Sequence, residues 1–308
     1  MELAAITAQQ IVILFILIFT GFVGVKAGVI KMEGKKAFSD LLIYIIVPAM
    51  IVDSYMTEFN PEILSNLIKT FGLSALLLLV GLAVTMLLTV KMNDKDRAIT
   101  RFACIFSNAA YMGFPLINAL FGKEGMLYAS AFVTMFNLLL WTVGYAMVSG
   151  QVKPKEVMRN IFATPAIISV VIGLVLYLCR IQVPEIIKQP VSLVGSMNTP
   201  LSMIITGMII AGSKAQSLFS NRKLIFVIVV RMFVIPAICF GLFVLFRING
   251  TAAQVVLLLE SCPTAAMTSV MAVQFNHDEN LAAGAVVITT FLSILVLPAC
   301  AYLTTLFI

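Results

Sequence analysis

Charge is scarce in this sequence. Only 11% of its 308 residues are charged, against about a quarter in an ordinary soluble domain, and 61% are hydrophobic. The apolar residues form continuous runs of about the 20 residues that a helix needs to cross a bilayer, without the alternation that marks a transmembrane barrel. The composition excludes a soluble domain and predicts an all-α polytopic membrane protein.

Histidine is rare, and paired cysteines and paired embedded aspartates are lacking. The single histidine, His277, falls in a polar turn, and the five cysteines lie in apolar segments with no CxxC pair, so we expect no metal site. Asp53 is the only embedded aspartate, whereas an intramembrane aspartyl protease needs two. The chain also lacks a P-loop, the nucleotide motif of a primary pump. We therefore expect neither an enzyme nor a resident cofactor.

Ten segments are long and apolar enough to span a membrane. They are residues 6–29, 36–56, 66–90, 98–121, 125–149, 161–179, 190–213, 223–246, 251–275 and 279–306. The first run is of spanning length and residues 1–10 lack a basic region, so we expect no cleavable signal peptide. The expected setting is a multi-pass protein in the cell (inner) membrane, with the lipid bilayer as its surroundings.

The basic residues predict the orientation of these segments. One set of alternate loops holds fourteen of them: Lys26, Lys31, Lys35, Lys36, Lys91, Lys95, Arg97, Arg101, Lys153, Lys155, Arg159, Lys214, Arg222 and Lys223. The opposite set holds five: Lys69, Lys123, Arg180, Lys188 and Arg247. Cytoplasmic loops carry the excess of Lys and Arg, so both termini are expected outside the cytoplasm. The net charge of +6 thus indicates topology, and we expect no nucleic acid as a partner.

Prolines fall at matching places in the two halves of the chain. Pro48 and Pro200 interrupt the second and seventh predicted helices, and Pro115 and Pro263 interrupt the fourth and ninth. Because each half holds five helices, an odd number, a second copy would enter the membrane from the opposite face, as in many secondary transporters. We expect repeats at 1–150 and 161–308, joined by a cytoplasmic linker at 151–160.

The interrupted fourth and ninth helices predict a binding site in mid-membrane. Proline removes a helix hydrogen bond, and in lipid the freed backbone groups need partners in the protein or in a water-filled cavity. The helix starts that follow carry free N–H groups and positive dipole ends. Two such starts meeting near residues 112–116 and 263–267 would favour an anion.

Three polar side chains at depth have both a functional and a structural interpretation. Asn108 shares the first interruption with Pro115 and would bind substrate, or hydrogen-bond between helices. Glu260 would bind a coupling sodium ion or proton, or be the structural partner of Arg231. Arg231 would attract an anionic substrate, or instead pair with Glu260 or cap carbonyls freed by an interruption.

Together these motifs resemble the auxin efflux carrier (PIN-like) family, whose bacterial members include malate and malonate permease-like proteins. The resemblance covers nearly the whole chain and rests on Asn108 with residues 112–116, on 137–141, on 231–236, and on 262–263 with 275–276. It implies ten transmembrane helices in two inverted five-helix repeats, with the broken helices four and nine crossed. It also implies a homodimer and elevator-type movement of helices 3–5 and 8–10 against a scaffold of helices 1, 2, 6 and 7.

The resemblance also implies a substrate site at the point where helices four and nine cross. Its expected residues are Asn108, Tyr111, Met112, Gly113, Pro115, Asn137, Pro263 and Thr264, with the two asparagine amides as the main ligands. The more distantly similar bile acid sodium symporters have an acidic sodium ligand on helix nine, which Glu260 matches. Thr264 stands where that family has Gln, and a sodium site at Glu260 and Thr264 is one expectation beside proton coupling.

These observations predict a secondary active carrier of small organic anions, with mono- or dicarboxylates as the expected class. Nothing in the chain favours auxin as the substrate. A sodium-coupled carrier like the bile acid symporters is one alternative. The other is a channel, or a sensor that binds its ligand without moving it.

Overall fold

The computed structural model describes residues 2–308 except 93–94, 152–157, 161–162 and 213–221. Most of the predicted linker, 151–160, therefore lies outside the described residues. Helices are the only regular secondary-structure elements in the part of the chain that is described, which confirms the predicted all-α class. A single isolated antiparallel bridge joins Ser107 to Thr264.

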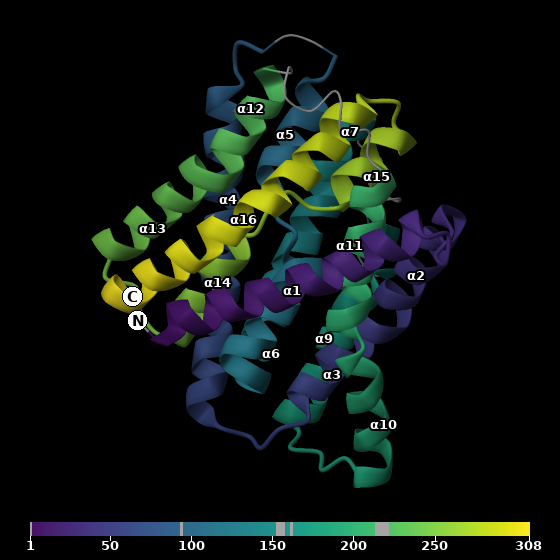
Figure 1. Ribbon diagram of the computed structural model, residues 1–308. Helices are drawn as coiled ribbons and strands as arrows, with labels where there is room; N and C mark the ends of the chain where they lie inside the picture. The colour runs from purple at the N-terminus through teal and green to yellow at the C-terminus, as the bar shows by residue number, and fades with distance from the viewer. Residues whose placement is uncertain (1, 93–94, 152–157, 161–162, 213–221) are drawn as a thin grey trace.

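Helices follow one another with short connections throughout the described chain (Figure 1). The first half contains α1 (Glu2–Lys26), η1 (Met32–Gly34), α2 (Lys35–Leu41), η2 (Leu42–Ile46), α3 (Val47–Tyr55), α4 (Pro61–Leu88), α5 (Arg97–Ile105), η3 (Ala109–Gly113), α6 (Phe114–Leu139), η4 (Leu140–Gly144) and α7 (Tyr145–Ser149). The second half contains α9 (Pro165–Leu178), α10 (Glu185–Ser196), α11 (Asn198–Gly212), α12 (Arg222–Val229), η6 (Val230–Val234), α13 (Ile235–Leu245), α14 (Thr251–Glu260), α15 (Met267–Gln274) and α16 (Glu279–Phe307).

Seven helical stretches of the described chain are long and apolar enough to cross a membrane. They are Ile6–Lys26, Met32–Tyr55, Pro61–Leu88, Ala109–Ser149, Glu185–Gly212, Arg222–Leu245 and Glu279–Phe307. Two shorter apolar helices, α9 and α14, accompany them. Large apolar side chains such as Ile16 and Phe19 remain exposed, as expected where lipid rather than water is the surrounding solvent. The molecule is a polytopic membrane protein.

Three prolines each follow a π-helical turn directly. Pro48, Pro115 and Pro236 come after η2, η3 and η6, within the first turn of the next α-helix. Proline has no N–H to donate to the helical hydrogen-bond ladder, and its ring collides with the carbonyl four residues before it. The wider π turn accommodates both the missing hydrogen bond and the ring. The prediction that Pro48 interrupts its helix is therefore wrong, since helix runs on through it.

The other predicted interruptions are shifted rather than absent. Pro200 lies in the first turn of α11, and the helical ladder is disturbed instead at Met197, between α10 and α11. Pro115 likewise lies in the first turn of α6, and the non-helical residues are 106–108, upstream of it. Only Pro263 lies within a non-helical segment itself.

The long stretch Ala109–Ser149 is bent at a glycine. Gly122 has φ 56° and ψ −146°, which is not a helical conformation. A Cβ atom on Gly125 would lie only 2.3 Å from the Cβ of Phe121, so the chain turns sharply here. The short gap between the predicted fourth and fifth segments, 98–121 and 125–149, begins at Gly122.

The two halves of the chain interlock through α1 and α11, which form the most extensive helix pair. A Cβ atom on Gly207 would lie 2.1 Å from the carbonyl oxygen of Ile18, and one on Gly21 would lie 2.3 Å from that of Ile204. We call this contact the α1–α11 seam. Glycine is required because the two backbones touch. Figure 1 shows α1 passing obliquely across the molecule, and α1 also contacts α16.

Candidate binding site at the chain crossing

Two non-helical segments from opposite halves of the chain meet in the buried centre. Residues 106–108 separate α5 from η3, and residues 261–266 separate α14 from α15; we call these two segments the crossing. The backbone N–H of Asn108 donates to the carbonyl of Pro263 at 2.7 Å, and that of Ala265 donates to Phe106 at 2.8 Å. Peptide groups released from both helices thus satisfy one another in a short antiparallel ladder.

Arg231 ties both sides of the crossing together. Its Nη1 donates to the carbonyl oxygens of Cys104 at 3.2 Å and Ile105 at 3.0 Å, at the end of α5. Its Nε donates to the carbonyl of Cys262, just past α14, at 3.1 Å. The side chain is fully buried. Since the last carbonyls of a helix have no partner inside it and carry a partial negative charge, the guanidinium caps two helix ends at once.

Glu260, the last residue of α14, completes this arrangement. Its Oε1 accepts a hydrogen bond from Arg231 Nη1 at 3.0 Å, in an ion pair with no exposure on either side. Gly81 of α4 lies beside the carboxylate, and a Cβ there would be in ordinary van der Waals contact with Oε1, at 3.4 Å. Glu260 Oε2 and Arg231 Nη2 have no hydrogen-bond partner among the described residues. The pairing of Arg231 with Glu260 and its capping of carbonyls are both contacts that the structural interpretation of the sequence anticipated.

Asn108 stands at the end of the first interruption with its amide nitrogen free. Its backbone carbonyl accepts from the N–H groups of Met112 at 3.0 Å and Gly113 at 3.2 Å, which starts the π turn η3. The side chain is 3% exposed, and its Nδ2 has no partner in the described part of the chain. A buried amide donor without a partner is costly, so this group is available to a ligand.

Asn137 is placed differently. It is half-buried on α6, and its Nδ2 donates to the carbonyl of Val133, one turn earlier, at 2.8 Å. Its neighbour Phe136 packs edge-on against the ring of Phe106 in the crossing, with centroids 5.4 Å apart. The Asn137 amide nitrogen is thus engaged within its own helix.

Thr264 is held on two sides. Its backbone N–H donates to Thr289 Oγ1 of α16 at 3.0 Å, and its own Oγ1 donates to the carbonyl of Ala103 in α5 at 3.1 Å. Sequence reasoning missed Thr289 and the contact to Ala103. A signal existed, since Thr289, Thr290 and Ser293 are the hydroxyl-bearing residues within the apolar stretch 281–301 of the final helix.

The remaining predicted residues line the first turns after residue 108. Gly113 lies against α14, where a Cβ would come within 2.5 Å of Leu259 Cδ2. Met112 is buried, and its sulfur accepts from Ser293 Oγ at 3.6 Å. Pro115 is buried in the first turn of α6, while Tyr111 is half-buried at the edge of the core.

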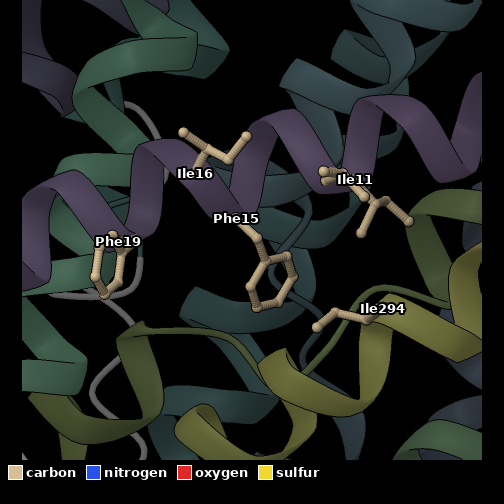
Figure 2. Close-up of a pocket in the computed structure, with 6 residues that line it drawn as sticks. Ile11, Phe15, Ile16, Phe19 and Ile294 are labelled. Atoms are coloured by element: carbon tan, nitrogen blue, oxygen red, sulfur yellow. The ribbon is translucent and has the colours of Figure 1, made fainter.

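Two surface hollows are lined by residues outside the crossing. Figure 2 shows the first, a groove of about 290 Å³ lined by Ile11, Val12, Phe15, Ile16 and Phe19 of α1 and Ile294 of α16. All its side chains are apolar, so it offers nothing to bind a carboxylate. The second, of about 460 Å³, lies near the start of α5 and is lined by Met86, Arg97, Ala98, Arg101, Val143, Ala146 and Met147.

Interrupted helices that meet in the buried centre of a polytopic helical protein are typical of secondary transporters. The model of the family described as "Membrane transport protein" matches residues 6–160 and 152–300. The chain belongs to this family, which is that of the auxin efflux (PIN-like) carriers, and the resemblance noted in the sequence is confirmed.

Two archaeal relatives extend along almost the whole chain. An uncharacterized transporter of Methanocaldococcus jannaschii is 26% identical over 307 residues, covering 95% of this chain and 97% of the relative. An uncharacterized transporter of Methanothermobacter thermautotrophicus is 21% identical over 299 residues, covering 95% and 96%. The family and these names support a transporter rather than an enzyme.

Proposed function

We propose that the protein is a secondary active carrier of small organic anions, mono- or dicarboxylates, which bind at the crossing. The observation that carries this proposal is the buried Asn108 amide, whose Nδ2 has no partner among the described residues. It stands where η3 and α6 begin, next to Pro263 of the opposite segment. An amide donor beside helix starts can bind a carboxylate without a permanent charge in the membrane.

The electrostatics of the crossing agree with an anion of low charge. Arg231 and Glu260 neutralise one another, so the pair adds no net charge to the site. The helix starts at Ala109 and Met267 contribute only partial positive charge. A mono- or dicarboxylate would accept hydrogen bonds from the free donors. A large hydrophobic anion would find little space among these fully buried groups.

Ten membrane crossings in two inverted repeats are part of the proposal. Three features raise the seven long stretches to ten crossings. Gly122 divides the stretch Ala109–Ser149 into two, with α5 leading into the first part. The helix α9 adds one crossing, and α14 with α15 beyond it adds another.

The elevator movement is also proposed. The first, second, sixth and seventh predicted helices correspond to α1, α2–α3, α9 and α10–α11, and α1 packs on α11 while α3 packs on α9 and α10. This grouping supports a scaffold distinct from the elements that carry the crossing. A homodimer through the scaffold, with both termini outside the cytoplasm of a cell membrane, completes the proposal.

Flux measurements on proteoliposomes test the carrier and its site together. Wild-type protein should show saturable carboxylate uptake and counterflow, whereas a channel would show neither and a sensor would bind without flux. Asn108→Ala should lower uptake at least about tenfold, the effect of losing roughly 1.4 kcal/mol of binding. Asn118→Ala is the matched control, because this asparagine is exposed on α6 and should leave uptake unchanged. Undiminished transport by Asn108→Ala would remove the residue from the site.

Sodium- or proton-coupled transport through Glu260 is the alternative within the carrier class. The unpaired Oε2 of Glu260 is the observation that favours it. A thermal-shift panel of mono- and dicarboxylates, each with and without sodium and across pH, distinguishes coupled from uncoupled binding. A carboxylate shift that requires sodium or low pH would support coupling.

A further inference from the structure

Four oxygen atoms surround the guanidinium of Arg231. Three are main-chain carbonyls, of Cys104, Ile105 and Cys262, and the fourth is the carboxylate oxygen Oε1 of Glu260. Unwound carbonyls, helix C-terminal ends and a carboxylate are the groups with which transporters coordinate a sodium ion in mid-membrane. In this chain the same set of acceptors is already bound to a covalently attached cation.

We propose that Arg231 is a fixed internal cation that takes the place of a coupling sodium ion, so that the protein works without sodium. The inference rests on the proposed function only in treating the crossing as the transport site. It assigns Arg231 a positioning role: the residue holds the ends of α5 and α14 in the arrangement in which Asn108 meets a substrate.

The chemistry of arginine suits this role. A guanidinium remains protonated in proteins and offers five N–H donors in a rigid fork, so it satisfies several acceptors at fixed angles. Its charge offsets the Glu260 carboxylate together with the partial negative charge of two helix ends. A sodium ion would do the same but would enter and leave in each cycle, whereas Arg231 stays in place on η6.

The surroundings keep the guanidinium in position. Arg231 is fully buried, within the π turn η6 that precedes Pro236. The wider π turn and the proline fix the direction in which this part of the helix presents its side chains. On the opposite side, Gly81 of α4 packs beside the Glu260 carboxylate. Arg231 and Glu260 therefore form one unit, assembled from α4, α14 and the α12–η6–α13 stretch.

Sodium-dependent thermal stability tests this assignment without any substrate. The purified protein is unfolded by heat in sodium chloride and in choline chloride of equal ionic strength. The wild type should unfold at the same temperature in both. Arg231→Ala should unfold several degrees higher in sodium than in choline, because its carbonyls and Glu260 become free to bind the ion, which stabilises the folded state.

Two further variants separate this role from a merely structural one. Arg231→Ala combined with Glu260→Gln should lose the sodium effect, because the carboxylate of the vacated site is gone. Arg231→Lys keeps a positive charge on the side chain and should remain insensitive to sodium. A variant that only lost packing would be destabilised equally in both salts.

Three results would overturn the proposal. The first is a sodium shift in the wild type that Glu260→Gln abolishes. The second is a folded Arg231→Ala variant that does not respond to sodium. The third is an Arg231→Ala variant that cannot be recovered folded in either salt, since sodium should replace the missing cation. None of these results bears on carboxylate flux or on Asn108→Ala, so the carrier proposal stands or fails separately.

Discussion

The crossing and the α1–α11 seam both bring backbone from the two halves of the chain into contact, by opposite means. At the seam the helices are intact, and Gly21 and Gly207 let their backbones touch. At the crossing the helices are interrupted, and backbone hydrogen bonds with a buried ion pair join the segments. Close approach within a bilayer thus needs small side chains where helices continue and directional bonds where they do not.

The largest effect is expected from unpairing the charges of the crossing. Glu260→Ala leaves the Arg231 guanidinium buried without its carboxylate and should lower the free energy of unfolding by about 3–5 kcal/mol in sodium-free buffer. Replacing both residues by Met should recover part of this loss, because no unpaired charge remains. Reversible denaturant unfolding in detergent measures both. Glu279→Ala, at an exposed glutamate, is the control, and a loss of under about 1 kcal/mol for Glu260→Ala would contradict the comparison.

The seam should be sensitive to size and not to charge. Gly207→Ala places a Cβ against the carbonyl oxygen of Ile18 and forces α1 and α11 apart, which should cost about 3 kcal/mol, the upper part of the usual range for overpacking. Thermal unfolding measures the loss. Gly241→Ala is the matched control, since a Cβ there meets nothing within 4 Å and the change should be neutral or stabilising. Equal effects for the two variants would show that the seam does not depend on backbone contact.

A single hydroxyl tests how strongly the crossing depends on hydrogen bonds. Thr289→Val keeps the side-chain shape but leaves the N–H of Thr264 unpaired, and should cost about 1–2 kcal/mol. Thr290→Val is the control, because its hydroxyl donates only to Val286 within α16. Chemical denaturation of the two variants side by side gives the difference. If Thr290→Val proved the more damaging, the contact between α16 and the crossing would carry little energy.

The smallest effect is expected from an ion pair at the protein surface. Lys123, at the turn after Gly122, lies 3.0 Å from Asp53 of α3, with side chains 47% and 14% exposed. Lys123→Ala should cost under about 1 kcal/mol, since solvent screens exposed pairs. Lys36→Ala, which removes a more exposed pair with Asp40, should not change the melting temperature measurably. If Lys123→Ala lowered the free energy of unfolding as much as Glu260→Ala, burial would not explain the difference between the two ion pairs.

The sequence predicted a helical polytopic membrane protein correctly, because hydrophobic runs of spanning length depend on local composition. Ten spans were predicted, and seven helical stretches of the described chain are long and apolar enough to cross a membrane. The sequence also located the buried polar groups, since Asn108, Arg231 and Glu260 stand out in apolar surroundings. It placed the first interruption over residues 108–115, whereas the non-helical residues are 106–108. A proline is tolerated in the first turn of a helix, so the residue itself marks where a helix begins, and the non-helical segment lies before it.

Pairings between distant segments could not be read from the sequence. Nothing local indicates that Ser107 pairs with Thr264, or that Thr289 of α16 accepts from the Thr264 N–H. The Arg231 side chain had three interpretations of comparable merit until its acceptors were seen. Pro48 was misjudged because the π turn η2 absorbs the proline without breaking the helix.

The amino-acid sequence alone determined that this chain lies in a membrane as a bundle of helices, because the cost of exposing backbone and charge to lipid acts residue by residue. It also determined which few side chains had to find partners there. Only the tertiary structure decided which groups are those partners. Arg231, Glu260 and the ends of α5 and α14 come from parts of the chain that meet only when all the helices have packed.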